Sequence, residues 1–261
     1  MSNEKMNRDV RECIYDILAD EESKRVYDLI REARKYPQKE QYQYYQSAKA
    51  PGVDYYHFTM EDGYQVFGRN NMYFHNAFQQ FSEEEVLLDA GAFNGDTVQE
   101  FHYATKGKYK KIYSLEPDKR NYNELKRRMK YFIDTGKLET FRAGLGGETV
   151  RAKFKSGGTC AHVSNSGDTE IKLFHAGEFI DALEYSPTVI KMDIEGQEYD
   201  ALTAMADYLR NNKPMMSISI YHKQEDIWRI PKFVHEQMPK AKLYIRHNTN
   251  AFTETILYVC L

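Results

Sequence analysis

Cysteine is scarce in this chain of 261 residues, which has only Cys13, Cys160 and Cys260, far apart in the sequence. No Cys-x-x-Cys pair occurs, so a structural zinc site with the usual ligand spacing is not expected. An odd, dispersed set of cysteines also gives no disulfide framework. We therefore expect a reducing compartment, the cytoplasm.

Long apolar runs and a surplus of positive charge are lacking as well. No run approaches the ~20 apolar residues of a membrane-spanning helix, and the amino-terminal "MSNEKMNRDVREC" is too polar for a signal peptide. The formal net charge is −3, whereas nucleic-acid-binding domains usually show a clear basic excess. Two basic stretches, 106–111 and 119–130, are interpreted as a solvated turn and a solvated helix face. Neither a membrane nor a nucleic acid is expected as the main partner.

What the chain does have, from residue 85 onward, is an alternation of apolar strands and amphipathic helices. The expected strands are 86–90, 111–117, 138–145, 188–194 and 215–222, and the expected helices are 95–106, 119–134, 197–211 and one that holds Ile227, Ile230 and Val234. Such units predict an α/β fold with a parallel sheet covered on both faces. Two last strands, 242–248 and 254–260, have no helix between them, so one should be antiparallel. The stretch 146–187 is less regular.

The first 84 residues differ from the rest. Residues 7–36 show helical periodicity, with Asp20 as an N-cap between two helices, and Glu61-Asp62-Gly63 is a hairpin turn signal. We expect residues 1–84 to be an N-terminal helical and hairpin accessory segment and residues 85–261 to be the main domain. Many tyrosines lie in the accessory segment, which allows a homo-oligomer to pair through it.

Polar residues follow four of the predicted strands. Parallel strands place their carboxyl ends at one edge of a sheet, where ligands bind. A single acidic strand end has a simple explanation as a helix cap, but four converging ends predict a ligand site. The groups are Asp89, Gly91, Asn94, Gly95 and Asp96; Glu116 and Pro117; Asp193, Glu195 and Gly196; and Tyr221 and His222.

The chemistry of these positions narrows the ligand. Gly91 lets a ligand approach the backbone closely, and Glu116 is placed to accept both hydroxyls of a ribose. A dinucleotide and S-adenosylmethionine share that ribose. A pyrophosphate needs unobstructed backbone amides, whereas an ammonium and a sulfonium favour nearby carboxylates, which Asp89 and Asp96 supply. An NAD(P)-binding oxidoreductase and a non-catalytic S-adenosylmethionine-binding module are the alternatives.

The segments "LLDAGAFNGDT", "LEPD", "VIKMDIEGQEYDAL" and "SISIYHKQEDIWRIP" together with "YIRHN" and "ETILY" resemble the FkbM family of S-adenosylmethionine-dependent methyltransferases. The resemblance covers roughly residues 85–261. Asn94 stands one place later than the asparagine that the family often has in its turn. Residues 1–84 carry no such resemblance.

The resemblance implies a Rossmann-like methyltransferase fold, with a mostly parallel seven-stranded sheet and one antiparallel strand. The helical periodicity of residues 7–36 adds the expectation of a helical N-terminal cap. It implies methyl transfer from S-adenosylmethionine, typically to a hydroxyl on a small molecule or a sugar. The implied cofactor-binding residues are Asp89, Gly91, Ala92, Asn94, Gly95, Asp96, Thr97, Glu116, Pro117 and Asp193.

Methyl transfer to a hydroxyl needs a group that aligns the acceptor oxygen and takes its proton. His222 is the first candidate, because histidine has a reference pKa of ~6.5. Asp193 and Glu195, two apart on a strand and so on one face, are the alternatives. These three groups could instead bind a divalent metal ion that acidifies the hydroxyl, a possibility that we do not favour.

Other positions are weaker candidates. Arg246 and His247 lie on the sixth strand and are candidates for substrate contact. The loop at 155–168 is expected to cover the adenine or the substrate, and His162 within it is expected to be a surface histidine.

Overall fold

The computed structural model of the chain describes residues 13–36, 40, 59–61, 64–66, 72–75, 77–155, 162–163, 167, 169–249 and 252–261. The chain divides into two compact units: Phe58–Ile218, and Met1–His57 together with Ser219–Leu261. This division differs from the expected one at residue 84. The accessory role of residues 1–84 therefore stays a prediction.

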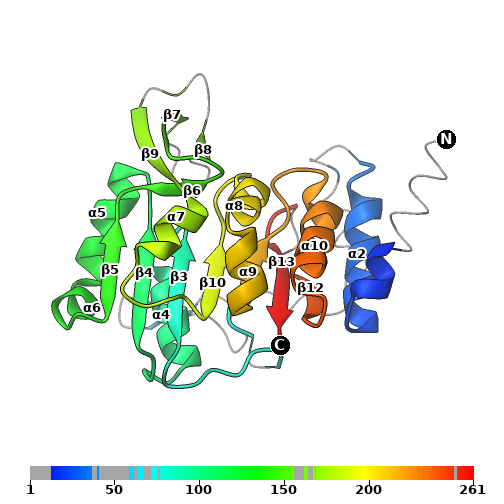
Figure 1. The fold of residues 1–261 in the computed structure, drawn as a ribbon, viewed down its shortest axis with the longest axis horizontal. Helices are drawn as coiled ribbons and strands as arrows, with labels where there is room; N and C mark the ends of the chain where they lie inside the picture. The colour runs from blue at the N-terminus through cyan, green and yellow to red at the C-terminus, as the bar shows by residue number, and fades with distance from the viewer. Residues whose placement is uncertain are drawn as a thin grey trace. The chain divides into compact units, whose positions relative to one another are not determined.

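The unit Phe58–Ile218 is built on parallel strands. In spatial order these are β11 (Met215–Ser219), β10 (Val189–Met192), β3 (Val86–Ala90), β4 (Lys111–Leu115) and β5 (Leu138–Phe141), each parallel to its neighbour. Every residue of β3 and β10 is buried. Strands covered on both faces read as continuous apolar runs, which is why the sequence revealed them. Figure 1 shows β10, β3, β4 and β5 side by side.

Helices follow these strands, but two of them are divided. The helices are α4 (Asp96–Ala104), α5 (Lys119–Arg128), α6 (Lys130–Asp134), α7 (Ala176–Asp181), α8 (Glu198–Ala204) and α9 (Ala206–Asn212). The single helices expected at 119–134 and 197–211 are wrong in this respect, because the chain bends at Met129 and Met205. Both methionines are buried. The apolar spacing continues through each bend, so periodicity alone does not reveal it.

A second sheet lies between residues 144 and 175, most of which fall in the stretch without a regular sequence pattern. Its strands are β6 (Gly144–Gly146), β9 (Thr169–His175), β7 (Val150–Lys155) and β8 (His162–Val163), in that order (Figure 1). The single strand expected at 138–145 is therefore wrong, because it is two strands in different sheets. Apart from β6, which is buried throughout, the described residues that this sheet buries are Phe154, Ile171 and Leu173. With so few apolar residues, its strands lack a strong alternating signal.

The hairpin expected around Glu61-Asp62-Gly63 is confirmed. β1 (Thr59–Glu61) pairs with β2 (Tyr64–Val66) in antiparallel register, with Glu61 opposite Tyr64.

The unit of residues 1–57 and 219–261 contains α2 (Glu21–Ala33), α10 (Asp226–Gln237), β12 (Lys242–His247) and β13 (Thr255–Cys260) (Figure 1). A helical turn at 13–17 precedes α2. β12 and β13 pair in antiparallel register and belong, with the five parallel strands, to a seven-stranded sheet. The expected seven-stranded, mostly parallel sheet is confirmed.

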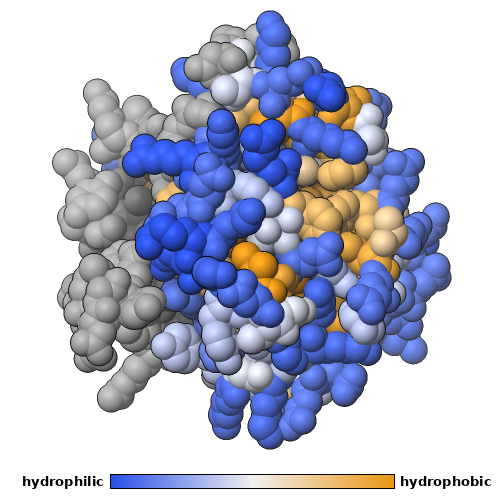
Figure 2. All heavy atoms as spheres, turned by 90° about the vertical axis from the view of Figure 1, so that its left-hand side faces the viewer, coloured by the Kyte–Doolittle hydropathy of each residue, from blue (hydrophilic) through white to orange (hydrophobic). Residues whose placement is uncertain are grey.

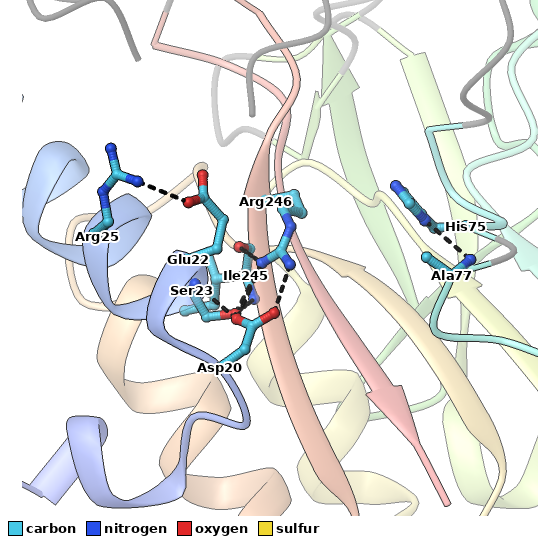
Figure 3. Close-up of polar contacts among 8 residues, drawn as sticks. All are labelled: Asp20, Glu22, Ser23, Arg25, His75, Ala77, Ile245 and Arg246. Atoms are coloured by element: carbon cyan, nitrogen blue, oxygen red, sulfur yellow. Dashed lines mark hydrogen bonds and ion pairs between the residues drawn. The ribbon is translucent and has the colours of Figure 1, made fainter. Parts of the chain in front are cut away.

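Asp20 joins α2 to β12, as Figure 3 shows. Its Oδ1 accepts a hydrogen bond from the Ser23 backbone nitrogen at 2.8 Å, which confirms the predicted N-cap. Its Oδ2 lies 2.7 Å from Arg246 Nη2. The Ser23 hydroxyl in turn accepts a hydrogen bond from the Ile245 backbone nitrogen at 3.0 Å. Arg246, a candidate for substrate contact, thus has a structural partner.

The basic residues of α5 lie on a hydrophilic face. Figure 2 turns toward the viewer the side on which α5 and α6 lie in Figure 1, and most side chains there are hydrophilic. Arg127 pairs with Glu124, and Lys130 of α6 pairs with Asp134. This agrees with the solvated helix face predicted from the sequence. Within the described part of the chain, no helix is both long and apolar enough to cross a bilayer.

Candidate functional site

The turn between β3 and α4 is packed directly on the end of β10. Gly91 has a φ of +81°, and a Cβ at this position would lie 1.8 Å from the backbone oxygen of Asp193. Gly95 has a φ of +90°, and its Cβ would lie 2.6 Å from Cγ of Met129. Both positions require glycine for conformation and for space. The two glycines therefore fix the turn against β10 and against the end of α5.

Several backbone amides of this turn are already used inside the protein. Those of Gly91 and Ala92 donate to the carbonyl oxygen of Leu115 at 3.0 and 2.9 Å. The amide of Phe93 donates to Glu116 Oε2 at 2.9 Å, and that of Gly95 to the carbonyl oxygen of Ala92 at 2.8 Å. A pyrophosphate needs such amides turned toward it. The turn therefore suits a ligand other than a dinucleotide.

The side chain of Asn94 provides a hydrogen-bond acceptor in the turn that a ligand could use. Its Oδ1 is buried and has no hydrogen-bond partner within the described part of the protein. Burying an amide oxygen without a partner costs about 1–3 kcal/mol. The one-place shift of this asparagine therefore still leaves an acceptor available in the turn.

Asp89 and Lys191 form a buried ion pair at the centre of the site. The register of β3 with β10 places these residues side by side, and Lys191 Nζ lies 3.4 Å from Asp89 Oδ1. Lys191 Nζ also donates to the backbone oxygen of Gly91 at 2.5 Å. Ser114 of β4 donates its hydroxyl to Asp89 Oδ2 at 3.1 Å. The pair therefore ties β3, β4 and β10 together at the ligand edge.

Three carboxyl groups act electrostatically on Lys191. Burial by itself would lower the pKa of Lys191, but the charges of Asp89, Asp193 and Asp96 raise it. Lys191 is thus held as a cation among three carboxylic acids. Such an excess of acids favours a ligand that brings positive charge of its own. Asp96 opens α4, where it accepts a hydrogen bond from the Thr97 amide at 2.8 Å.

Glu116 follows β4 and is held by the backbone. It is 5% exposed, and its Oε1 accepts from the amide of Asp118 at 2.8 Å while its Oε2 accepts from Phe93. Burial raises the pKa of Glu116 to about 7. Each oxygen has a second lone pair, so two further hydroxyl donors can still be accepted. Pro117, which follows, is partly exposed.

One placement inferred from the sequence is wrong. β10 ends at Met192, so Asp193 and Glu195 do not share a strand face. Glu195 instead has a φ of +55°, in the left-handed region, and belongs to the turn that leads into α8. A strand end cannot be located from an apolar run when the polar residues after it belong to a turn.

Two residues that were not predicted from the sequence, Tyr73 and Glu100, also contribute to the site. The hydroxyl of Tyr73 donates to Asp193 Oδ2 at 2.7 Å. Glu100 of α4 accepts the backbone amides of Tyr73 and Phe74 on its Oε1, at 2.6 and 3.1 Å. Glu100 had a signal, since it is an acid on the apolar side of a helix beside Phe101. Tyr73 had none, because tyrosine is common throughout this chain.

His222 belongs to the other compact unit, in the segment between β11 and α10. It is half-buried, and its ring centroid lies 4.1 Å from that of Tyr221. His247, in the same unit, is buried with Nδ1 2.9 Å from Thr255 Oγ1. The catalytic role of His222 stays a prediction. Of the loop at 155–168, the cover expected over the ligand and the side chain of His162 lie outside the described residues.

Comparison with known proteins adds the family. The family model "Methyltransferase FkbM domain" matches residues 89–250. A methyltransferase FkbM structure from Methylobacillus flagellatus KT is 23% identical with a TM-score of 0.72, covering 97% of this chain and 59% of that chain. At this identity the likeness shows the fold alone. Because the match covers 59% of that chain, this chain spans less than two thirds of its length.

Two further structures are more distant. An rRNA methylase from Streptococcus thermophilus is 11% identical with a TM-score of 0.43, over 68% of this chain and 86% of that one. A protein from Streptococcus mutans, solved in complex with SAH, is 11% identical with a TM-score of 0.42, over 67% of this chain and 89% of that one. No curated protein matches this chain.

Proposed function

Because this chain belongs to the FkbM methyltransferase family, we propose that it transfers the methyl group of S-adenosylmethionine to a hydroxyl of a small molecule or sugar. The family is the one that the sequence motifs indicated. The dependence on S-adenosylmethionine and the hydroxyl acceptor are the parts that need a test.

The observation that carries the proposal is the match between the turn's free groups and this cofactor. The buried Oδ1 of Asn94 lacks a partner within the described residues, and Glu116 keeps lone pairs for the ribose hydroxyls. The acids around Lys191 would receive the ammonium and the sulfonium. Several amides of the turn donate inside the protein, which disfavours the pyrophosphate of an NAD(P)-dependent oxidoreductase.

Bound at this edge, S-adenosylmethionine would supply an electrophilic methyl group. The chain's own residues would then align the acceptor oxygen and take its proton. We assign the proton to His222, on the chemistry of imidazole and its place directly after β11. Asp193 and Glu195 are the alternative bases or would orient the acceptor. The direct hydrogen bond from Tyr73 favours an orienting role for Asp193.

Calorimetry with S-adenosylhomocysteine and with NAD tests the cofactor. We expect S-adenosylhomocysteine to bind and NAD not to bind at the same concentration. Glu116→Ala should weaken S-adenosylhomocysteine binding by about 10-fold or more, because each hydrogen bond to a charged group contributes about 1.5–3 kcal/mol. Glu139→Ala on β5, where the side chain is exposed, is the matched control and should bind as the native chain does. Binding of NAD alone would exclude the methyltransferase proposal.

Transfer of a labelled methyl group to a panel of hydroxyl acceptors tests catalysis. His222→Ala should leave S-adenosylhomocysteine affinity unchanged and lower turnover by about 10²–10⁴-fold if His222 is the base. His235→Ala, a half-buried histidine of α10, is the control. Unchanged turnover in His222→Ala would assign the base elsewhere. Cofactor binding without transfer to any acceptor would favour the alternative of a non-catalytic binding module.

A further inference from the structure

Tyr73 is tied to the site by four contacts from one residue. Its hydroxyl donates to Asp193 at 2.7 Å, and its ring centroid lies 4.9 Å from Lys191 Nζ. Its amide donates to Glu100 at 2.6 Å, and its carbonyl oxygen accepts a hydrogen bond from the Ser217 hydroxyl of β11. The residue is buried, with 5% exposure. The backbone and the hydroxyl of Tyr73 are therefore all held by neighbouring groups.

The neighbours of Tyr73 form a short strap, which we define as residues 72–75. Glu100 accepts the amides of both Tyr73 and Phe74 on one oxygen. Phe74 is fully buried, with its ring centroid 4.9 Å from that of Phe101 on α4. Gln79 reinforces the far side by donating to the Ser217 hydroxyl at 3.1 Å. The strap is thereby fastened to α4, which follows β3, and to β11; β3 and β11 are the two neighbours of β10 in the sheet.

The strap lies outside the part of the chain that the family model matches, which begins at residue 89. Its contacts nevertheless reach Asp193 and Lys191, two residues within that part. The aromatic face covers the cation, and the hydroxyl occupies one oxygen of the carboxylate. Because the hydrogen bond from Tyr73 holds Oδ2, it also sets the direction of Oδ1 of the same carboxylate.

We propose that Tyr73 is a positioning residue, which orients the Asp193 carboxylate toward the cationic methionine side of the cofactor. This inference rests on the proposed function and extends it to a residue that precedes the family's matched region. Tyr73 acts through Asp193 and does not touch the reacting atoms. Glu100 acts on Asp193 indirectly, because it accepts a hydrogen bond from the backbone amide of Tyr73.

The test separates the two halves of the cofactor. S-adenosylhomocysteine carries both the adenosine and the amino-acid part, whereas 5′-methylthioadenosine keeps the adenosine and the sulfur and lacks the amino-acid part. Tyr73→Phe removes the hydroxyl and keeps the ring, the backbone contacts and the volume. We expect Tyr73→Phe to raise the dissociation constant of S-adenosylhomocysteine about 10-fold and to leave that of 5′-methylthioadenosine within about 2-fold, because one charge-assisted hydrogen bond orients Asp193.

A matched control excludes a general loss of rigidity. Tyr208 is also a buried tyrosine of the same unit, and its hydroxyl donates to the backbone oxygen of Pro187 at 2.6 Å. Tyr208→Phe loses an equivalent hydrogen bond at the other end of β10, so both ligands should bind it as they bind the native chain. Glu100→Ala should reproduce the loss seen in Tyr73→Phe, since it releases the strap.

The outcomes distinguish this inference from the proposed function. If the native chain does not bind S-adenosylhomocysteine, the proposed function fails and the inference with it. If the native chain binds and Tyr73→Phe binds S-adenosylhomocysteine equally well, the inference alone is overturned. Equal losses for the two ligands would also overturn it, because they would show a purely structural role. A loss confined to S-adenosylhomocysteine supports it.

Discussion

At the scale of single residues, the site depends on groups that have no freedom to change. Gly91 meets the backbone of Asp193, which cannot move aside as a side chain could. Lys191 is buried and would be costly to keep charged without the acids beside it. Glu100 and Glu116 are buried acids whose oxygens accept hydrogen bonds from backbone amides. Each of these residues combines a structural duty with a place in the site.

Replacing Gly91 by alanine should lower the free energy of unfolding by about 3 kcal/mol or more, from the strain of a left-handed residue and the overlap with a backbone oxygen. Gly136 is the matched control, since its φ is +72° but nothing lies within 4 Å of its added Cβ. Gly136→Ala should therefore cost only about 1 kcal/mol, the strain alone. Urea denaturation measures both. Equal losses would mean that the contact with Asp193 is unimportant.

The pH dependence of stability should carry a contribution from Glu100. Burial raises the pKa of Glu100 to about 8 in the folded protein, whereas the unfolded chain has the ordinary glutamate value. The stability from its protonated form is thus complete below about pH 4.5 and is lost as the pH rises through about 8. Glu100→Gln lacks this ionisation, so its stability relative to the native chain should increase between pH 6 and pH 9 by at least about 1 kcal/mol. Urea titrations across this range check it; parallel curves would contradict it.

At the scale of elements, α2 is joined to β12 by a cap that serves two purposes. Asp20 caps the helix by accepting a hydrogen bond from the backbone amide of Ser23, and it forms an ion pair with Arg246 on the strand. A backbone bond from Ala19 to the Leu243 oxygen at 2.8 Å adds to the junction. The sequence predicts the cap from its own local pattern. The ion pair lies beyond such a pattern, because its partner is more than two hundred positions away.

Two substitutions at Asp20 separate the cap from the ion pair. Asp20→Ala loses both and should cost about 2 kcal/mol, whereas Asp20→Asn keeps an N-cap acceptor and should cost about 1 kcal/mol. Burial opposes ionisation of Asp20, but the bond from Arg246 outweighs it and lowers the pKa. The charge-dependent part should therefore be present above about pH 4 and be lost as the pH falls below 3.8. Thermal unfolding at two acidic pH values measures this, and identical losses for both variants would refute a role for the pair.

At the scale of the whole molecule, the compact units and the family region have different limits. The family model covers 89–250, whereas one unit joins residues 1–57 with residues 219–261. The apolar face of α2, including Val26, Tyr27 and Ile30, is buried in that unit. The residues of α2, which precede the family region, are therefore part of the core of this unit.

Removing residues 1–57 should consequently destabilise the remainder. A fragment of residues 58–261 would lose the partners of the Leu243 oxygen and the Ile245 amide, together with the buried side chains of α2. Exposed apolar area costs about 25 cal/mol per Å², so we expect a lower unfolding midpoint or aggregation. Lys35→Ala in the full chain, at an exposed position after α2, is the control and should unfold as the native chain does. An unchanged midpoint for the fragment would instead support the accessory role expected for residues 1–84.

The sequence by itself determined the parallel strands, the antiparallel end of the chain, the glycine turn, the Asp20 cap and the family. A strand buried on both faces needs consecutive apolar residues, and a tight turn needs glycine at a particular position. Local sequence patterns therefore suffice to predict both. Only the tertiary structure decided that Glu195 leaves the strand, that residues 138–145 divide between two sheets, and that Tyr73 reaches Asp193. These features depend on pairings between distant positions. Such pairings leave no periodic signal, because each is made by a single side chain whose partner is chosen by the fold.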